Sequence, residues 1–240
     1  MFKKRYLGLS LVVVILFMVG KVATNETTTK PLVVAFNKSL YSVSDPNSLW
    51  VIVNKARPIS PITFIPNNLV TPKVLLRYPG NEDSEVSTLI KSPLENLFSA
   101  AKTAKLDLAL TSAYRSYDYQ TSVYNGFIST LGKTETDKVS ARPGYSEHQT
   151  GLAVDVEPVS HKCELDACFG TTPEGVWLAA NVYKYGFIIR YTSNKTAVTG
   201  YSYEPWHIRY VGVLLSNEMH KEGVQTLEEF FNVPGGSNYN

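Results

Sequence analysis

Cysteine is scarce in this chain, and the zinc-protease signature H-E-x-x-H is absent. The 240 residues include two cysteines, Cys163 and Cys168, and four histidines. A structural zinc site takes four such ligands, but there is no second cysteine pair, and His161 is the one histidine close to the two cysteines. The rival interpretation is that the two cysteines form half of a zinc site, but the sequence does not supply the other half. In an exported protein, we favour a local disulfide between Cys163 and Cys168.

A strong charge bias and internal repeats are also lacking. The formal net charge is +2, and leaving out the three cations Lys3, Lys4 and Arg5 changes it to −1. The sequence thus offers no basic face, and we expect no nucleic-acid partner. With 44% hydrophobic residues, the chain is long enough for one domain with a sizeable core and too short for two large ones.

Long apolar runs are confined to the N-terminus. The run from Leu7 to Gly20 carries no charge and is shorter than the roughly 20 residues that a spanning helix needs. Because a basic cluster precedes it, we predict that residues 1–24 are a signal peptide or an N-terminal membrane anchor. Val22-Ala23-Thr24 only approximates a cleavage site, so both options stay open. We expect an extracytoplasmic protein, secreted or anchored to the outer face of the cell membrane, with membrane contact only through this segment.

The rest of the chain divides into a linker at 25–47, one folded domain at 48–232 and a frayed tail at 233–240. Ser92 and Pro93 predict the start of a helix that runs to about Lys105. Hydrophobic patterns predict strands at 48–55, 106–111, 152–156, 187–191 and 208–211, and helices at 117–131, 173–186 and 213–221. Strands and helices do not alternate regularly. The predicted fold class is therefore α+β, a small central antiparallel sheet with flanking helices.

One stretch offers two metal-capable side chains, His148 and Asp155, on either side of Thr150-Gly151. Seven residues span roughly 23 Å in a strand and roughly 10 Å in a helix, so neither geometry brings both side chains to one ion. The chain must bend, and Gly151 can supply the bend because it lacks a Cβ. With His207 as a third ligand, two imidazoles and a carboxylate suit one zinc ion per chain. A buried, hydrogen-bonded Asp155 without metal is the rival interpretation.

Two further residues fit hydrolytic chemistry at such a site. Glu204, three residues before His207, could take a proton from a zinc-bound water, whose pKa the metal lowers. Arg115 is predicted at a strand-to-helix junction, from which it could stabilise an oxyanion in the cleft. Gln120 lies about one turn into the following helix and could face the same way. This combination of metal, base and cation is that of a metallopeptidase.

Three segments carry a family resemblance: S-A-Y-R-S (112–116), S-E-H-Q-T-G-L-A-V-D (146–155) and E-P-W-H (204–207). In this order and spacing, the chain resembles VanY-type zinc D-alanyl-D-alanine carboxypeptidases over about residues 48–232. The resemblance implies a D,D-peptidase or hedgehog-like zinc fold, and a monomer that acts on peptidoglycan stem peptides ending in D-alanine. It implies the roles that follow. Zinc is bound by His148, Asp155 and His207; Glu204 is the general base; Arg115 stabilises the transition state; and Gln120 and Ser146 contact the terminal substrate residue.

Four functions therefore remain to be distinguished. The first is a D,D-carboxypeptidase, and the second is an L,D-carboxypeptidase that acts on tetrapeptide stems. The third is a non-catalytic, zinc-containing cell-wall-binding domain, which would have no reason to keep Glu204 and Arg115. The fourth is a metal-independent wall protein. The loop at Cys163–Cys168 departs from the resemblance and could border the cleft, altering access to it.

Overall fold

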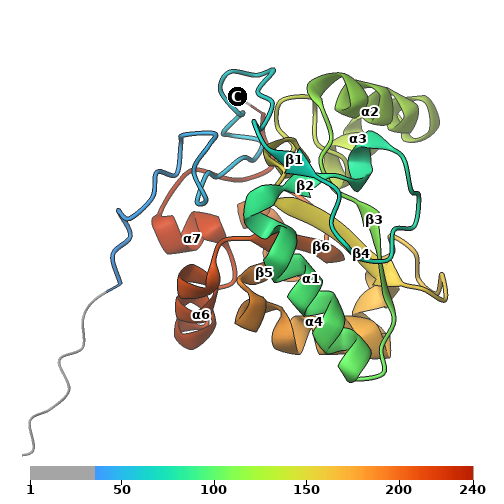
Figure 1. Cartoon of the computed structure of the whole chain (residues 1–240). Coiled ribbons are helices and arrows are strands. Elements are labelled where there is room, and N and C mark those ends of the chain that lie inside the picture. Colours follow the sequence, from blue (N-terminus) through green and yellow to red (C-terminus); the bar gives the residue numbers. More distant parts are fainter. Residues whose placement is uncertain (1–35, 240) are drawn as a thin grey trace, which may run out of the picture. The chain divides into compact units, whose positions relative to one another are not determined.

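A four-stranded antiparallel sheet lies at the centre of this structure, a computed structural model that describes residues 36–239 (Figure 1). The strand order is β3-β4-β6-β5, and every neighbouring pair is antiparallel. The bounds are Leu108–Ser112 for β3, Ala153–Pro158 for β4, Phe187–Tyr191 for β5 and Glu204–Tyr210 for β6. The predicted α+β fold with a small antiparallel sheet and flanking helices is confirmed.

The other elements surround this sheet. Strands β1 (Leu69–Val70) and β2 (Val86–Ser87) form a separate two-stranded sheet. The α-helices are α1 (Thr88–Thr103), α2 (Tyr117–Leu131), α3 (Lys133–Val139), α4 (Pro173–Asn181), α5 (Thr196–Thr199), α6 (Val213–Glu222) and α7 (Leu227–Phe231). Short 3-10 turns are η1 (Glu82–Ser84), η2 (Glu147–Thr150), η3 (Ala167–Thr171) and η4 (Val182–Tyr185). No helix within residues 36–239 combines the length and apolar character needed to cross a membrane.

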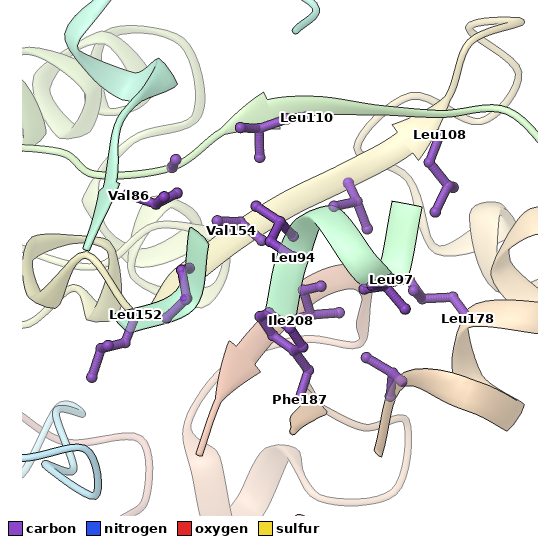
Figure 2. Close-up of a cluster of buried hydrophobic side chains, with 14 of the residues drawn as sticks. Val86, Leu94, Leu97, Leu108, Leu110, Leu152, Val154, Leu178, Phe187 and Ile208 are labelled. Atoms are coloured by element: carbon purple, nitrogen blue, oxygen red, sulfur yellow. The ribbon is translucent and has the colours of Figure 1, made fainter. Parts of the chain in front are cut away.

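The main core lies between the sheet and helix α1, which crosses one face of the sheet beside α4 (Figure 1). Leu94 and Leu97 of α1 point toward Val154 of β4 and Ile208 of β6, and all four side chains are fully buried (Figure 2). Their spacing places them on one stripe of α1, as amphipathic periodicity requires. This packing holds β4 and β6, the two strands that carry the site, on a rigid base.

Helix α1 begins earlier than predicted. Ser87 caps it by accepting a hydrogen bond from the Leu89 N–H, and Pro93 lies inside the helix. The prediction of Ser92 as the cap was therefore wrong. It rested on Pro93, which usually lies in the first turn because it has no N–H to donate to the carbonyl four residues earlier. The apolar stripe starts at Ile90, which is fully buried, and burial of this extra turn outweighs one lost hydrogen bond.

The predicted strand at 48–55 was wrong: residues 48–50 form a bend and a turn, and the buried residues that follow have no ladder partner among the described residues. The segment forms only an isolated bridge between Asn54 and Arg57, while Trp50 packs in a second apolar cluster with α6 and α7. Side-chain burial, not sheet pairing, accounts for its apolar composition. Strand β6 also differs from its prediction, since it begins at Glu204 and so includes the whole E-P-W-H segment.

Residues at both ends of the described chain contact the folded domain, including Phe36 of the expected linker and Tyr239 of the expected tail. The Phe36 ring stacks on Trp50 at 5.5 Å between centroids, within the segment expected to be linker. The Tyr239 hydroxyl accepts a hydrogen bond from the Arg142 N–H at 3.2 Å, and its ring meets Tyr145 edge-on. Aromatic burial therefore orders both ends of the described chain. The predicted N-terminal segment, 1–24, lies outside the described residues.

Candidate metal centre and catalytic cleft

The bend between His148 and Asp155 is built by a 3-10 turn followed by a glycine. Residues Glu147–Thr150 form η2, and Gly151 then adopts a left-handed conformation with φ of 67°. A Cβ at Gly151 would lie 3.1 Å from the Ser87 backbone nitrogen, so a larger residue would meet both backbone strain and crowding. Strand β4 begins two residues later, and the predicted bend at Gly151 is confirmed.

Strand pairing brings the third residue to the other two. Asp155 of β4 and His207 of β6 are direct cross-strand partners, so their side chains emerge on the same face of the sheet. Asp155 Oδ1 lies 3.0 Å from His207 Nδ1, and Asp155 Oδ2 lies 3.3 Å from His148 Nε2. One ligand atom from each of the three residues lies within 4.8 Å of the others. The structure thus brings together the three predicted ligands, all of them buried.

Hydrogen bonds orient the two imidazoles. His148 Nδ1 lies 2.5 Å from the Ala113 carbonyl oxygen, so Nδ1 carries the proton and donates it. Nε2 then has a free lone pair that can bind a metal ion. His148 Nε2 is buried and has no hydrogen-bond partner within the described part of the chain. Burial, together with the nearby positive charge of Arg115, lowers the pKa of His148 to about 4. Its ring is therefore neutral at pH 7, as a metal ligand must be.

His207 differs because anionic groups lie on both sides of its ring. Burial alone would lower its pKa, but Asp155 and Glu147 outweigh burial and raise the pKa to about 9. Without a metal, the site therefore holds a proton between carboxylates. A divalent cation could replace that proton, because the surrounding charge is negative.

Glu204 and Arg115 line the same cleft as the three candidate ligands. Glu204 Oε2 lies 3.9 Å from His207 Nδ1, and burial raises the pKa of Glu204 to about 8. Arg115 follows β3, and its N–H donates to the His148 carbonyl at 3.3 Å. Its Nε is buried and has no hydrogen-bond partner among residues 36–239. A raised carboxylate pKa and a guanidinium whose Nε has no hydrogen-bond partner in the described chain suit acid–base and oxyanion chemistry.

The two predicted substrate contacts have different positions. Ser146 is buried at the start of η2 and lines the cleft. Gln120 does not line it: its Nε2 donates to the Ala141 carbonyl at 2.7 Å, and Ala141 lies in the cleft wall. Helix α2 turns Gln120 toward the 140–141 segment, which gives it a supporting position behind the cleft wall, and its direct contact with the substrate stays a prediction.

Sequence reasoning missed a buried ionic network beneath the site. Glu147 Oε1 accepts hydrogen bonds from Arg190 Nε at 2.8 Å and from Arg209 Nη1 at 2.9 Å. Arg190 also makes a bidentate contact with Glu228 at 2.9 and 2.6 Å. Glu147 Oε2 remains 3.7 Å from His207 Nε2, the side of the ring that faces away from Asp155. Arginines within the apolar runs F-I-I-R-Y and H-I-R-Y were the available signal, because a buried charge requires a partner.

Two further cleft residues were also missed. Tyr191 of β5 packs against His207 with 4.9 Å between ring centroids, and it pairs with Glu204 across the β5–β6 ladder. Leu165 belongs to the loop closed by Cys163 and Cys168, and its side chain lines the cleft. The predicted disulfide is confirmed, with an S–S distance of 2.05 Å. The loop therefore borders the cleft.

Comparisons with known proteins agree with this geometry. The family model for VanY, D-alanyl-D-alanine carboxypeptidase, matches residues 83–213. The protein YodJ of Bacillus subtilis (strain 168) is 39% identical over 200 residues, covering 80% of this chain and 70% of YodJ.

Solved structures extend the likeness to the fold. The LD-carboxypeptidase LdcB superposes with a TM-score of 0.73 at 39% identity, covering 79% of this chain and 88% of LdcB. A mutant of the vancomycin resistance D,D-pentapeptidase VanY, in complex with Zn(II), superposes with a TM-score of 0.62 at 29% identity, covering 76% and 98% of the two chains. The matched residues 83–213 include all three motifs and every candidate ligand. The chain belongs to the VanY family of D-alanyl-D-alanine carboxypeptidases.

Proposed function

We propose that this protein is a zinc-dependent carboxypeptidase that removes the C-terminal D-alanine from peptidoglycan stem peptides. The observation that carries the proposal is the convergence of His148, Asp155 and His207 in one cleft with Glu204 and Arg115. Membership of a carboxypeptidase family gives the reaction class. The buried cluster supplies the groups that the hydrolysis of a peptide bond requires.

The three ligand candidates fit zinc. Two nitrogen donors and one carboxylate oxygen are a common catalytic zinc set, and they leave a coordination position open. His148 Nε2 is buried, oriented and without a hydrogen-bond partner in the described structure, and such an atom otherwise costs about 1–3 kcal/mol. A zinc ion bound there would lower the pKa of a bound water toward neutrality and polarise the scissile carbonyl. The complex of the related VanY with Zn(II) supports the choice of metal.

Glu204 is the proposed general base. Burial raises its pKa to about 8, so it can accept a proton from the attacking water and later return it to the leaving amine of D-alanine. A nearby divalent cation would favour the ionised carboxylate, which is the form that a base needs. Glu204 is the direct cross-strand partner of Tyr191 in the β5–β6 ladder, which places it on a strand and not on a mobile loop.

Arg115 and Ser146 are proposed to position the substrate. The Arg115 guanidinium can stabilise the negative charge that develops on the scissile carbonyl oxygen, because its Nε has no other partner in the described structure. Ser146 lines the cleft next to the candidate ligands and can contact the terminal D-alanine. Gln120 contributes indirectly by holding Ala141 in the cleft wall.

Two stem peptides are candidate substrates. The family model favours a pentapeptide ending in D-Ala-D-Ala, which makes the protein a D,D-carboxypeptidase. The second candidate is a tetrapeptide in which an L-Lys–D-Ala bond is cut. Likeness to solved structures supports that alternative, since the chain is 39% identical to the LD-carboxypeptidase LdcB and 29% identical to the D,D-pentapeptidase VanY. Two D-alanyl-D-alanine carboxypeptidases, from Enterococcus faecalis and Enterococcus faecium, match the chain at 37% and 42% identity and support the first.

Release of D-alanine from each stem peptide tests the proposal. Purified protein with zinc is incubated with the pentapeptide or the tetrapeptide, and free D-alanine is measured. Glu204→Gln should retain about one zinc per chain and lose turnover by about a hundredfold or more, since a general base contributes roughly 10²–10⁴-fold. Absence of D-alanine from both peptides, with zinc bound, would refute the proposed function. Turnover by Glu204→Gln at the wild-type rate would refute its role as base.

We further propose that the enzyme acts as a monomer outside the cytoplasmic membrane. The apolar segment within residues 1–24 supports export, and peptidoglycan stems are an extracytoplasmic substrate. Cell fractionation and size-exclusion chromatography test the two statements. A cytoplasmic location, or a stable dimer, would contradict them.

A further inference from the structure

The loop closed by the disulfide carries an unusual concentration of backbone strain. We refer to residues 161–168 as the cysteine loop. His161, Cys163 and Leu165 have φ values of 59°, 62° and 45°, in the left-handed region that residues with a Cβ rarely adopt. Each such residue costs roughly 1–2 kcal/mol. Strain of this kind persists where the surrounding structure enforces it, and it often accompanies a functional position.

Several contacts enforce this conformation of the cysteine loop. The Cys163–Cys168 disulfide closes it, and the Leu165 N–H donates to Glu157 Oε1. Glu157 is completely buried in β4, where it also accepts a hydrogen bond from Thr111 at 2.8 Å. At the start of the loop, Arg77 Nη1 contacts His161 Nε2 at 2.7 Å. The loop is therefore anchored to the sheet by its backbone.

The result of this anchoring is an apolar side chain presented at the cleft. Leu165 is 49% exposed, yet it lines the same cleft as the candidate zinc ligands. Phe127 and Val139 line that cleft as well and are 40% and 43% exposed, and Trp206 adds a partly buried indole. Exposed apolar groups that gather at a cleft indicate a binding surface. Its chemistry suits the aliphatic part of a substrate side chain, such as the methylene groups of lysine.

We propose that Leu165 is a specificity-determining residue, held by the disulfide-closed loop to contact the aliphatic part of the side chain that precedes the D-Ala or D-Ala-D-Ala terminus of the substrate. The inference rests on the proposed function, because it assigns the upstream part of that peptide substrate to this surface. The candidate zinc ligands and Glu204 act on the terminal bond, whereas Leu165 contacts the residue that precedes the D-Ala or D-Ala-D-Ala terminus. Loss of the contact should therefore raise KM and leave the chemistry of the bound peptide unaltered.

Two matched peptides test this role. N-acetylated peptides carry either norleucine or glycine as the upstream residue, followed by D-Ala-D-Ala or by D-Ala, whichever series the wild-type protein cleaves. In Leu165→Ala, the ratio of kcat/KM for the norleucine peptide to that for the glycine peptide should fall about 5- to 10-fold. This is the lower end of the effect of apolar groups in enclosed pockets, because the surface is half open. Leu214→Ala is the matched control, since Leu214 is 68% exposed on α6, and it should keep the wild-type ratio.

The outcomes separate this inference from the proposed function. A Leu165→Ala variant with the wild-type ratio, or with equal losses for both peptides, would overturn the specificity role while D-alanine release stands. A wild-type protein that releases D-alanine from no peptide would overturn the proposed function, and the inference with it.

The disulfide has its own test. A double variant, Cys163→Ser with Cys168→Ser, retains Leu165 but removes the closure of the loop. We expect its norleucine-to-glycine ratio to fall in the same direction as in Leu165→Ala, with zinc content unchanged at about one ion per chain. A wild-type ratio in the double variant would show that the disulfide does not hold Leu165 in place, and would overturn that part of the proposal.

Discussion

Replacing Glu147 by glutamine should both destabilise the domain and weaken zinc binding. Glu147 is fully buried and accepts hydrogen bonds from Arg190 and Arg209, while its second oxygen lies 3.7 Å from His207 Nε2. Glutamine keeps the size of the side chain but removes its charge. The lost charge no longer compensates the buried Arg190 and Arg209, and it no longer interacts with the candidate metal ligand His207.

The two effects can be given magnitudes. Glu147, Glu228, Arg190 and Arg209 form a buried cluster of two anions and two cations, so Glu147→Gln leaves one positive charge without compensation. Such a loss costs about 3–5 kcal/mol, a large share of the roughly 5–15 kcal/mol that stabilises a typical domain. A carboxylate that contacts the far nitrogen of a metal-binding histidine typically contributes about 10–100-fold to metal affinity.

Glu228→Gln provides the matched control. It removes a negative charge from the same cluster, through the same Arg190, but the hydrogen bonds of Glu228 are to Arg190 and Asn54, not to a ligand candidate. Urea unfolding should therefore show similar losses of stability in both variants. Competition with a chelator should show weaker zinc binding, by about 10–100-fold, in Glu147→Gln alone. Equal zinc affinities in the two variants would refute the proposed link between Glu147 and His207.

Three further predictions concern stability, each measured by urea unfolding. Leu97→Ala leaves a cavity at a fully buried position under the sheet and should lower the free energy of unfolding by about 2–5 kcal/mol. Leu214→Ala on the surface should stay within about 0.5 kcal/mol of wild type, and similar losses in both variants would contradict the assigned core. Leu165→Gly should raise stability by up to about 1 kcal/mol, because glycine adopts φ of 45° without strain; a decrease would show that the loop is not strained there. Burial opposes ionisation of Asp137, but hydrogen bonds from Arg142 and Tyr124 outweigh it and lower its pKa below the ordinary 3.8. The ionised Asp137 carboxylate therefore stabilises the fold above pH 3.8, and this contribution is lost as pH falls through the lower folded pKa. Asp137→Asn should lower the free energy of unfolding by about 0.5–1 kcal/mol at pH 7 and by less near pH 3. A loss of stability that grows as the pH is lowered would contradict this prediction.

Elements with local signals were predicted well. Helix α2 spans Tyr117–Leu131 as expected, because Ser116 caps its start and Gly132 ends it. Strand β5 also has its predicted bounds, Phe187–Tyr191. Helix α1 was misplaced at its start, because Ser87 and Ser92 both offer capping chemistry and only the packing of Ile90 selects the first. Local patterns thus predict an element better than they predict its ends.

By itself, the sequence determined the residues of the candidate site and the bend between two of them. His148, Gly151, Asp155 and His207 were identified from side-chain chemistry and spacing alone, and the disulfide followed from two nearby cysteines. These features depend on neighbours in the chain, whose geometry a short peptide already restricts.

Only the tertiary structure decided how these residues meet and what supports them. Asp155 faces His207 because β4 and β6 pair in one register, and a shift by one residue would turn the two side chains to opposite faces. Glu147 contacts arginines 43 and 62 residues later in the chain, and Leu165 lines a cleft whose other lining residues lie as far away as Arg115 and His207. Register and the pairing of buried charges are set by long-range packing, which no local pattern records.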